Sequence, residues 1–530
     1  MTLTGLGRLV ALVVRRNRLA LALWAVAVVA LVIVQAAAVL DLYPDQRSVQ
    51  SYVDLFGDNP ALIAFAGPGY GFDDPNQGVV LVNEIQVFGC ILTALMSMFL
   101  VNRNTRAEED AERTDLLRAN VVGRHAPTAA AVAVVIALNL LVGVGCALGV
   151  IAVGFEVTGS IALAGSLTAV GLVFAGVTAV SAQVAASGRA TLGLTGTVLG
   201  AAFVLRAAGD ISGNGLSWLS PIGWAQAVRA YADERWWTLG LCLAVALGLV
   251  ALAFWLSTLR DVGSGLRAQR AGAERAAGWL TRPVGLAFRL QRGALAGWSA
   301  GLFGTGVIFG SLGEDVDRMI EENPAMADFF AQLEGVSLTD SFMATSLTML
   351  ALIAGGYAVS CALHLRGEES AGRVEWILAT PVSRVRWAAG GLAVAAGGTV
   401  LTILAAGLGL GVAYAVVSGD VVQVPRLAAA ALVTVPGILC LVGVAALLFG
   451  LVPRLAPVAW AVLAGMFVIG YFADLLQLPR WVRDLSPLEH LPRAPAETVT
   501  VLPILALTAV ACGLVAAGLW GLRRRDVQVG

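Results

Sequence analysis

The sequence contains no lysine, so all 34 of its basic residues are arginines. A phosphate-binding loop of the form G-x-x-x-x-G-K-[ST] needs its lysine to reach the terminal phosphates of ATP. The chain therefore has no such loop and is not itself an ATPase of that type. Charged residues occupy only 13% of the 530 positions, about half their share in soluble domains. This low charge excludes an ordinary soluble enzyme.

Residues that carry catalysis or bind metals are also scarce. The six cysteines are too few to form a disulfide framework for a chain of 530 residues. The three histidines, His125, His364 and His490, are scattered, and no His/Cys group has the spacing of metal ligands. No array of basic and aromatic residues indicates nucleic acid as a partner. We therefore predict no catalytic residue, no metal site and no cofactor bound by the chain itself.

Apolar residues, by contrast, make up 58% of the chain. A helix needs about 20 mostly apolar residues to cross the hydrocarbon core of a membrane. About twelve such runs predict an all-α polytopic membrane protein. The runs lie at roughly 19–40, 84–101, 129–153, 160–186, 191–208 and 237–259, and at roughly 294–312, 343–363, 389–417, 427–451, 455–473 and 500–522.

The second half of the sequence repeats landmarks of the first half in the same order. Because each half has an even number of spans, both halves enter the membrane from the same side and form a parallel repeat. We predict a first six-span half at 1–259, a linker with an amphipathic helix at 260–293, and a second six-span half at 294–530. The paired landmarks include Arg8 with Arg282, Trp24 with Trp298, Arg106 with Arg366, Arg189 with Arg454, and Ser220-Pro221 with Ser486-Pro487.

Arginines concentrate in alternate connections between the apolar runs. Arg8, Arg15 and Arg18 precede the first run and Arg523–Arg525 follow the last, whereas the loop after the first run is rich in Asp. Basic residues stay on the cytoplasmic side of a membrane. Arginine in place of lysine, with abundant Ala, Gly and Val, is typical of GC-rich bacterial genomes. We therefore expect a multi-pass protein of a bacterial plasma membrane with both termini in the cytoplasm.

The strongest local signal is a charged segment, R-x-E-E-x-x-x-R-x-[DE], after the second span of each half. Thr105 and Glu108 form a capping-box pattern, so we expect a short amphipathic helix of about three turns there. The alternative is a solvated helix in which the pairs Glu109–Arg113 and Glu369–Arg373 only support the helix. Two copies at matching places favour a functional role. The charged residues of the motif are Arg106, Glu108, Glu109, Arg113 and Asp115, and then Arg366, Glu368, Glu369, Arg373 and Glu375.

A second repeated feature precedes the first span of each half. Arg8 and Arg15 lie opposite an apolar stripe, and Arg282 and Arg289 repeat this arrangement. The spacing fits an amphipathic helix that lies in the inner headgroup layer. The alternative is that these arginines only set the orientation of the span that follows.

The charged segment, followed in its second copy by Thr380-Pro381-Val382-Ser383-Arg384, resembles the coupling region of type-two ABC exporter permeases. In that family each six-span half carries a cytoplasmic helix that docks on a separate ATPase subunit. The fused twelve-span form is similar to actinobacterial permeases that export polyketide antibiotics or other drugs. The resemblance implies two ATPase subunits per chain, which would bind ATP and magnesium, and a hydrophobic small molecule as substrate. The first copy has Asn120-Val121 in place of Thr380-Pro381, so we expect its docking to be weaker or asymmetric.

Two other functions remain open. A twelve-span ion-coupled secondary transporter would place ionisable residues inside its spans, whereas Glu84, Glu156 and Asp474 lie at predicted outer edges. A non-transporting membrane scaffold would have a similar sequence. Aromatic and methionine side chains on the spans are candidates for lining a hydrophobic substrate cavity, although on apolar helices such residues more often pack or contact lipid. These candidates are Phe88, Met96, Phe99, Phe342, Met349 and Phe467.

Overall fold

The computed structural model describes residues 3–56, 60–111, 122–260, 265–266, 274–313, 338–472 and 478–526. These residues form helices and connecting turns, and they contain no strand. The chain divides into two compact units, Met1–Gly272 and Ala273–Gly530. The boundary between the units falls inside the stretch 260–293.

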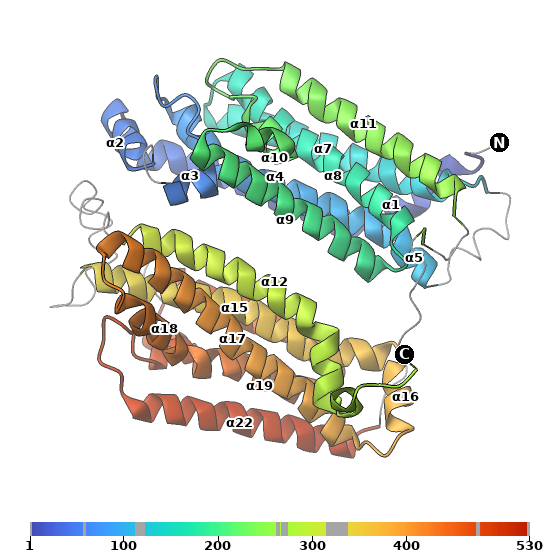
Figure 1. Cartoon of the computed structure of the whole chain (residues 1–530), viewed down its shortest axis with the longest axis vertical. Coiled ribbons are helices and arrows are strands. Elements are labelled where there is room, and N and C mark those ends of the chain that lie inside the picture. The colour runs from blue at the N-terminus through green and yellow to red at the C-terminus, as the bar shows by residue number, and fades with distance from the viewer. Residues whose placement is uncertain are drawn as a thin grey trace. The chain divides into compact units, whose positions relative to one another are not determined.

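Unit 1 is a bundle of long apolar helices with short helices at its two ends (Figure 1). Glycine and alanine are frequent on the long helices, which lets neighbouring backbones approach closely. The long helices are α1 (Leu6–Leu42), α4 (Gln77–Asn104), α7 (Ala126–Val153), α8 (Val157–Val184), α9 (Gly188–Ser212) and α11 (Trp237–Thr258). The short helices are α2 (Gln46–Phe56), α3 (Pro60–Ala66), α5 (Arg106–Asp110), η1 (Gly215–Leu219) and α10 (Pro221–Gln226).

Unit 2 has the same order of long helices. Its fourth span is divided at Thr434, because Pro436 opens a new helix there. The long helices are α12 (Pro283–Ser311), α15 (Leu338–Ser370), α17 (Arg384–Ser418), α18 (Gln423–Val433) with α19 (Val435–Leu451), α20 (Val458–Phe472) and α22 (Val501–Arg524). The short helices are η2 (Gly278–Thr281), α16 (Arg373–Leu378), η3 (Pro453–Leu455), α21 (Arg480–Arg483) and η4 (Pro487–His490).

Within the described residues, 11 helices are long and apolar enough to cross a membrane, when α4 is counted with α5 and α18 with α19. Each of the twelve predicted apolar runs overlaps one of these helices or α20, which is shorter, with 15 residues. The prediction of an all-α polytopic membrane protein is therefore confirmed.

The amphipathic stretch before the first span is part of the span helix itself. α1 has 37 residues, which corresponds to about 55 Å of helix at 1.5 Å per residue. α12 likewise runs without a break through Arg289, although it bends near its N-terminal end (Figure 1). The two amphipathic stretches therefore continue directly into the spans as first turns of α1 and α12.

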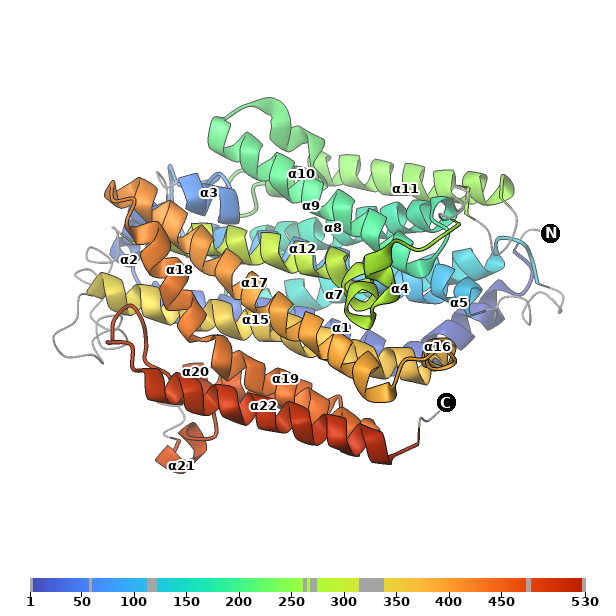
Figure 2. The same cartoon turned by 60° about the horizontal axis from the view of Figure 1, so that its bottom comes forward.

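In each unit one end of the bundle carries a cluster of arginines, which we call the arginine-rich end. It is formed where α1, α7, α12 and α17 begin and where α4, α11, α15 and α22 end. Figures 1 and 2 show α5 at this end of unit 1, and α16 at this end of unit 2. The arginine-rich end carries the repeated charged motif. The arginines include Arg8, Arg15, Arg16, Arg18, Arg103, Arg106, Arg124 and Arg260 in unit 1, and Arg282, Arg289, Arg366, Arg373, Arg384, Arg386, Arg523, Arg524 and Arg525 in unit 2.

Candidate functional site: the repeated charged motif

The second span of unit 1 ends at a break in the helix. The Thr105 hydroxyl donates back to the carbonyl oxygen of Val101 at 2.7 Å, and its side chain accepts no hydrogen bond from α5. The Glu108 carboxylate instead pairs with the guanidinium of Arg16. The predicted capping box is therefore wrong. The Thr105 hydroxyl therefore binds the last turn of α4, and α5 begins without a side-chain cap.

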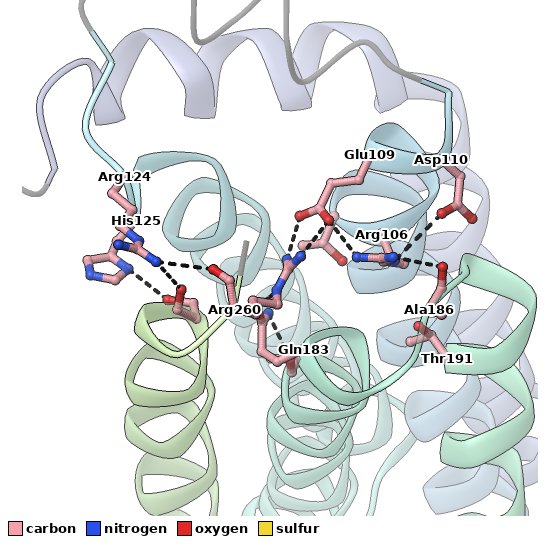
Figure 3. A network of polar contacts seen from close by, with 12 residues as sticks. Arg106, Glu109, Asp110, Arg124, His125, Gln183, Ala186, Thr191 and Arg260 are labelled. Carbon is pink, nitrogen blue, oxygen red and sulfur yellow. Dashed lines mark hydrogen bonds and ion pairs between the residues drawn. The ribbon is translucent and has the colours of Figure 1, made fainter. Parts of the chain in front are cut away.

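Glu109 lies at the centre of a buried charge cluster in unit 1 (Figure 3). Its two carboxylate oxygens accept hydrogen bonds from Arg260 at 2.8 and 2.6 Å, and one oxygen also accepts from Arg106 at 2.7 Å. Arg260 donates in addition to the side chain of Gln183 at 2.7 Å. The side chains of Glu109, Arg260 and Arg106 are only 12%, 8% and 1% exposed. Such a two-pronged pairing fixes the direction of both side chains.

Arg124, which lies just before α7, binds the end of α11 next to this cluster. The Arg124 guanidinium donates to the carbonyl oxygens of Ser257 at 2.8 Å, of Thr258 at 3.2 Å and of Arg260 at 3.3 Å (Figure 3). These carbonyls end α11 and lack helical partners, so a cation there satisfies them and complements the negative end of the helix. Glu109 and Arg124 are thus both bound to the residues at the end of the last span.

Unit 2 repeats this arrangement with matching residues. Glu369 accepts two hydrogen bonds from Arg525, both at 2.6 Å, and Arg384 donates to the carbonyl oxygen of Arg525 at 2.7 Å. The Arg525 guanidinium also lies 5.0 Å from the ring centre of Phe449. We call Glu109, Arg124 and Arg260 the first clamp, and Glu369, Arg384 and Arg525 the second clamp.

The sequence predicted Glu109 and Glu369 but missed the four arginines of the clamps. One signal was available for Arg124 and Arg384, because they are related by the same spacing as Arg106 and Arg366. Arg260 and Arg525 each follow the last span of their half, where arginine is also expected from the orientation rule. Their pairing with glutamate could be found only in the fold.

The motif of the second half is not a single helix of about three turns. α15 continues through Arg366 and Glu369 to Ser370, and Gly372, at φ 69°, reverses the chain before α16. Arg373 then donates to Glu368 at 2.9 and 3.0 Å, so the pairing of Arg373 with Glu369 that the alternative of a solvated helix assumed is wrong. The hydrogen bonds from Arg373 to the Glu368 carboxylate raise the pKa of Arg373.

α16 presents one apolar side chain to its surroundings. Val374 is buried, and Ile377 and Leu378 pack against the core of unit 2, whereas Trp376 is 82% exposed. Glu375 is exposed beside it. Trp376 was not among the predicted site residues, because the prediction rested on the charged residues of the motif. A tryptophan directly after a charged residue on a predicted connecting helix is the signal that could have found it.

The remaining predicted residues are distributed over both units. Arg113, Asp115 and the Asn120-Val121 pair lie outside the described residues, and Arg366 is half-buried. Met96 is fully buried in the core of unit 1, and Phe342 packs edge-on against Phe309. Met349 is half-buried, whereas Phe88, Phe99 and Phe467 are 36%, 43% and 42% exposed.

Two cavities in the described parts of the units are not lined by any candidate for the substrate cavity. A cavity of about 20 Å³ in unit 1 is lined by residues that include Tyr70, Gln86 and Arg229. A cavity of about 390 Å³ in unit 2 lies between α12 and α17. The substrate-cavity assignment therefore stays a prediction.

One buried ion pair inside a span was not predicted. Arg206, fully buried, lies 3.5 Å from Asp210 one turn further along α9, and its guanidinium is also within 3.4 Å of the carbonyl oxygens of Ile63 and Phe65. The predicted run 191–208 ended inside this pair, so Asp210 was treated as part of a loop. The pair lies toward the end of α9 that faces away from the arginine-rich end.

The fold and these sites define an all-helical polytopic membrane protein built of two six-span halves, each with its own clamp. The chain is 38% identical to the multidrug efflux system permease protein Rv1217c of Mycobacterium tuberculosis over 528 residues, which cover 99% of this chain and 96% of that protein. The family model for the C-terminal domain of the multidrug efflux system permease Rv1217c matches residues 280–523. The chain therefore belongs to the family of this efflux permease, and it is a membrane transport subunit.

Proposed function

We propose that the chain is the membrane permease of an ATP-driven ABC exporter, with one separate ATPase subunit docked on the charged motif of each half. The arginine-rich ends would then face the cytoplasm of a bacterial cell, with both termini on that side of the plasma membrane. ATP and magnesium would bind to the ATPase subunits. The exported substrate would be a hydrophobic small molecule of the drug or antibiotic class, as the name of the relative suggests.

The observation that carries the proposal is Trp376. A side chain of this size that is 82% exposed, on a short helix between the second and third spans, is unfavourable in water. Tryptophan and arginine are enriched among the residues that dominate protein–protein binding energy. Arg373, Glu375 and Trp376 together therefore offer a compact contact surface for an ATPase subunit.

The clamps connect the docking helix to the ends of the spans, so that docking would act on the spans. In the described part of the chain, α16 lies between Glu369 and Arg384, and both residues hold Arg525 at the end of α22. A force on α16 would reach the ends of α15, α17 and α22 together, because charge-paired and packed groups move as a unit. Closure of two ATPase subunits on ATP would in this way act on three spans of each half.

Replacement of Trp376 by alanine tests the docking. The chain is reconstituted in liposomes with its ABC ATPase subunit, and ATP hydrolysis and the affinity between the two proteins are measured. We expect Trp376→Ala to weaken ATPase binding by about 2 kcal/mol, roughly thirtyfold, and to lower substrate-stimulated hydrolysis accordingly.

Trp481→Ala is the matched control, because Trp481 is 69% exposed on α21, at the opposite end of unit 2. This variant should bind the ATPase like the wild type. Equal affinity of Trp376→Ala and the wild type for the ATPase would contradict docking through α16.

A further inference from the structure

An apolar groove runs along the outside of unit 2 between α12 and α17. It has a volume of about 390 Å³. Its floor is formed by the exposed Gly397 and the buried Gly398, and Phe288 and Leu401 flank it with exposed side chains. The lining residues are Val284, Gly285, Phe288, Leu295, Ala393, Val394, Gly397, Gly398 and Leu401.

The groove exists because α12 and α17 touch closely at two places and separate between them. Near the arginine-rich end, a Cβ on Gly390 would lie 3.1 Å from the Cβ of Pro283. Further along, a Cβ on Gly306 would lie 2.3 Å from the carbonyl oxygen of Ala406. Between these contacts α12 bends (Figure 1), and small residues on α17 leave the gap unfilled.

The length of the groove matches one leaflet of a bilayer. From Val284 to Leu295 the groove follows α12 for about 17 Å at 1.5 Å per residue, whereas the hydrocarbon core is about 30 Å thick. A transmembrane helix of a partner would need the full thickness. A single acyl chain of one leaflet fits the observed length.

Two exposed arginines, Arg282 and Arg386, lie at the end of the groove nearest the arginine-rich end, and a third, Arg292, lies further along α12. Arg282 directly precedes Pro283, and Arg386 lies one turn before Gly390, on the face of α17 that carries Ala393 and Gly397. Arg292 lies one turn after Phe288 on α12. Within the described parts of the chain, none of these three guanidinium groups is paired with a carboxylate. Trp279, 47% exposed, lies against Gly285 at the same depth, as expected for a side chain at the membrane interface.

The first half closes the corresponding place with its own side chains. The contact of Pro283 with Gly390 corresponds to the packing of Leu9 against Ala126 and Ala130 in unit 1. With that alignment, Ala126 stands where unit 2 has Arg386, and the buried Leu138 stands where it has Gly398. Arg386 and the floor of the groove are therefore specific to the second half.

We propose that this groove binds one anionic phospholipid, with an acyl chain along Gly397 and the phosphate group between Arg282 and Arg386. An acyl chain that enters the groove exchanges contact with other lipids for contact with the protein, and both surroundings are apolar. Apolar contact alone therefore gives little preference among lipids. The preference for an anionic headgroup comes from the arginines, each of which changes binding near a membrane surface by about fivefold. The site is independent of the ATPase docking proposed above.

The test uses the full chain in nanodiscs that contain equal amounts of phosphatidylglycerol and phosphatidylcholine. Native mass spectrometry after gentle release counts the lipids retained per chain. We expect the wild type to retain about one phosphatidylglycerol molecule, and Arg386→Gln to retain it about fivefold less well. Gly397→Leu should lose the lipid, because its side chain has open space to enter the groove: a Cβ at Gly397 meets nothing within 4 Å.

Two matched controls separate the groove from general lipid contact. Gly297→Leu places the same side chain on the opposite face of α12, where a Cβ also meets nothing within 4 Å. Arg289→Gln removes an exposed arginine that is not among the residues lining the groove. Both controls should retain the lipid like the wild type. Unchanged retention in Gly397→Leu, equal retention of phosphatidylcholine, or equal loss in the controls would each overturn the proposal.

Discussion

Glu369 illustrates how much one residue determines at the arginine-rich end. Its side chain is 5% exposed, and both of its oxygens accept hydrogen bonds from Arg525. Glutamine has the same shape but no charge, so Glu369→Gln leaves a largely buried guanidinium without its counterion. We expect a loss of about 3 kcal/mol in the stability of the folded chain, which corresponds to a fall in Tm of about 6 °C or more.

A double-mutant cycle distinguishes the ion pair from the shape of the site. Arg525→Gln alone should destabilise the chain, and the double variant Glu369→Gln with Arg525→Gln should cost less than the sum of the single variants, because neither charge is then left unpaired. Glu375→Gln is the control, since Glu375 is exposed and its removal should leave the Tm unchanged. Additive losses in the cycle would show that the clamp is not an energetic unit.

At the scale of the element, Gly372 decides how α16 leaves the span before it. Its φ of 69° is a left-handed conformation, which costs a residue with a Cβ about 1–2 kcal/mol. We expect Gly372→Ala to destabilise the turn by this amount and to reduce transport coupling, because α16 would be displaced relative to the second clamp. Transport and Tm are both measured in the reconstituted chain.

Gly367→Ala is the matched control for the turn. Gly367 lies in the same motif, inside α15, and a Cβ there meets nothing within 4 Å. Alanine is the better helix residue by about 1 kcal/mol, so this variant should be neutral or slightly more stable. If Gly367→Ala lost as much stability as Gly372→Ala, the loss in Gly372→Ala could not be assigned to the left-handed conformation of Gly372.

The sequence predicted elements better than it predicted contacts. The long helices could be found because a membrane span requires a fixed length of apolar residues. The break at Gly372 had a signal, a glycine after the last helical turn, but the continuous charge pattern suggested one helix. Glu109 pairs with a residue 151 positions away, and Glu369 with one 156 positions away. Partners at such distances follow from the packing of the spans, which a single sequence does not determine.

At the scale of the whole molecule, the repeated clamps indicate that each half is a complete mechanical unit. Each clamp joins the second, third and sixth spans of its own half. The halves nevertheless differ, because Ala137 and Ala126 stand in the first half where the second has Gly397, which lines the groove, and Arg386. Under the two proposals above, both halves would respond to ATPase subunits through their clamps, and the second half would also bind a lipid.

The source of energy is the property that separates an ATP-driven exporter from an ion-coupled carrier. Arg206 and Asp210 are the described buried ion pair within a span of unit 1, and a proton-coupled carrier would need such a carboxylate to take up and release protons. In an exporter driven by ATPase subunits the pair is structural, because the arginine already neutralises the carboxylate. We expect inverted vesicles that contain the chain and its ATPase to accumulate a fluorescent hydrophobic substrate with ATP, equally well after an uncoupler has collapsed the proton gradient. Vanadate, which arrests ABC ATPases, should abolish the accumulation. Loss of accumulation with the uncoupler, at undiminished ATP, would instead favour an ion-coupled carrier.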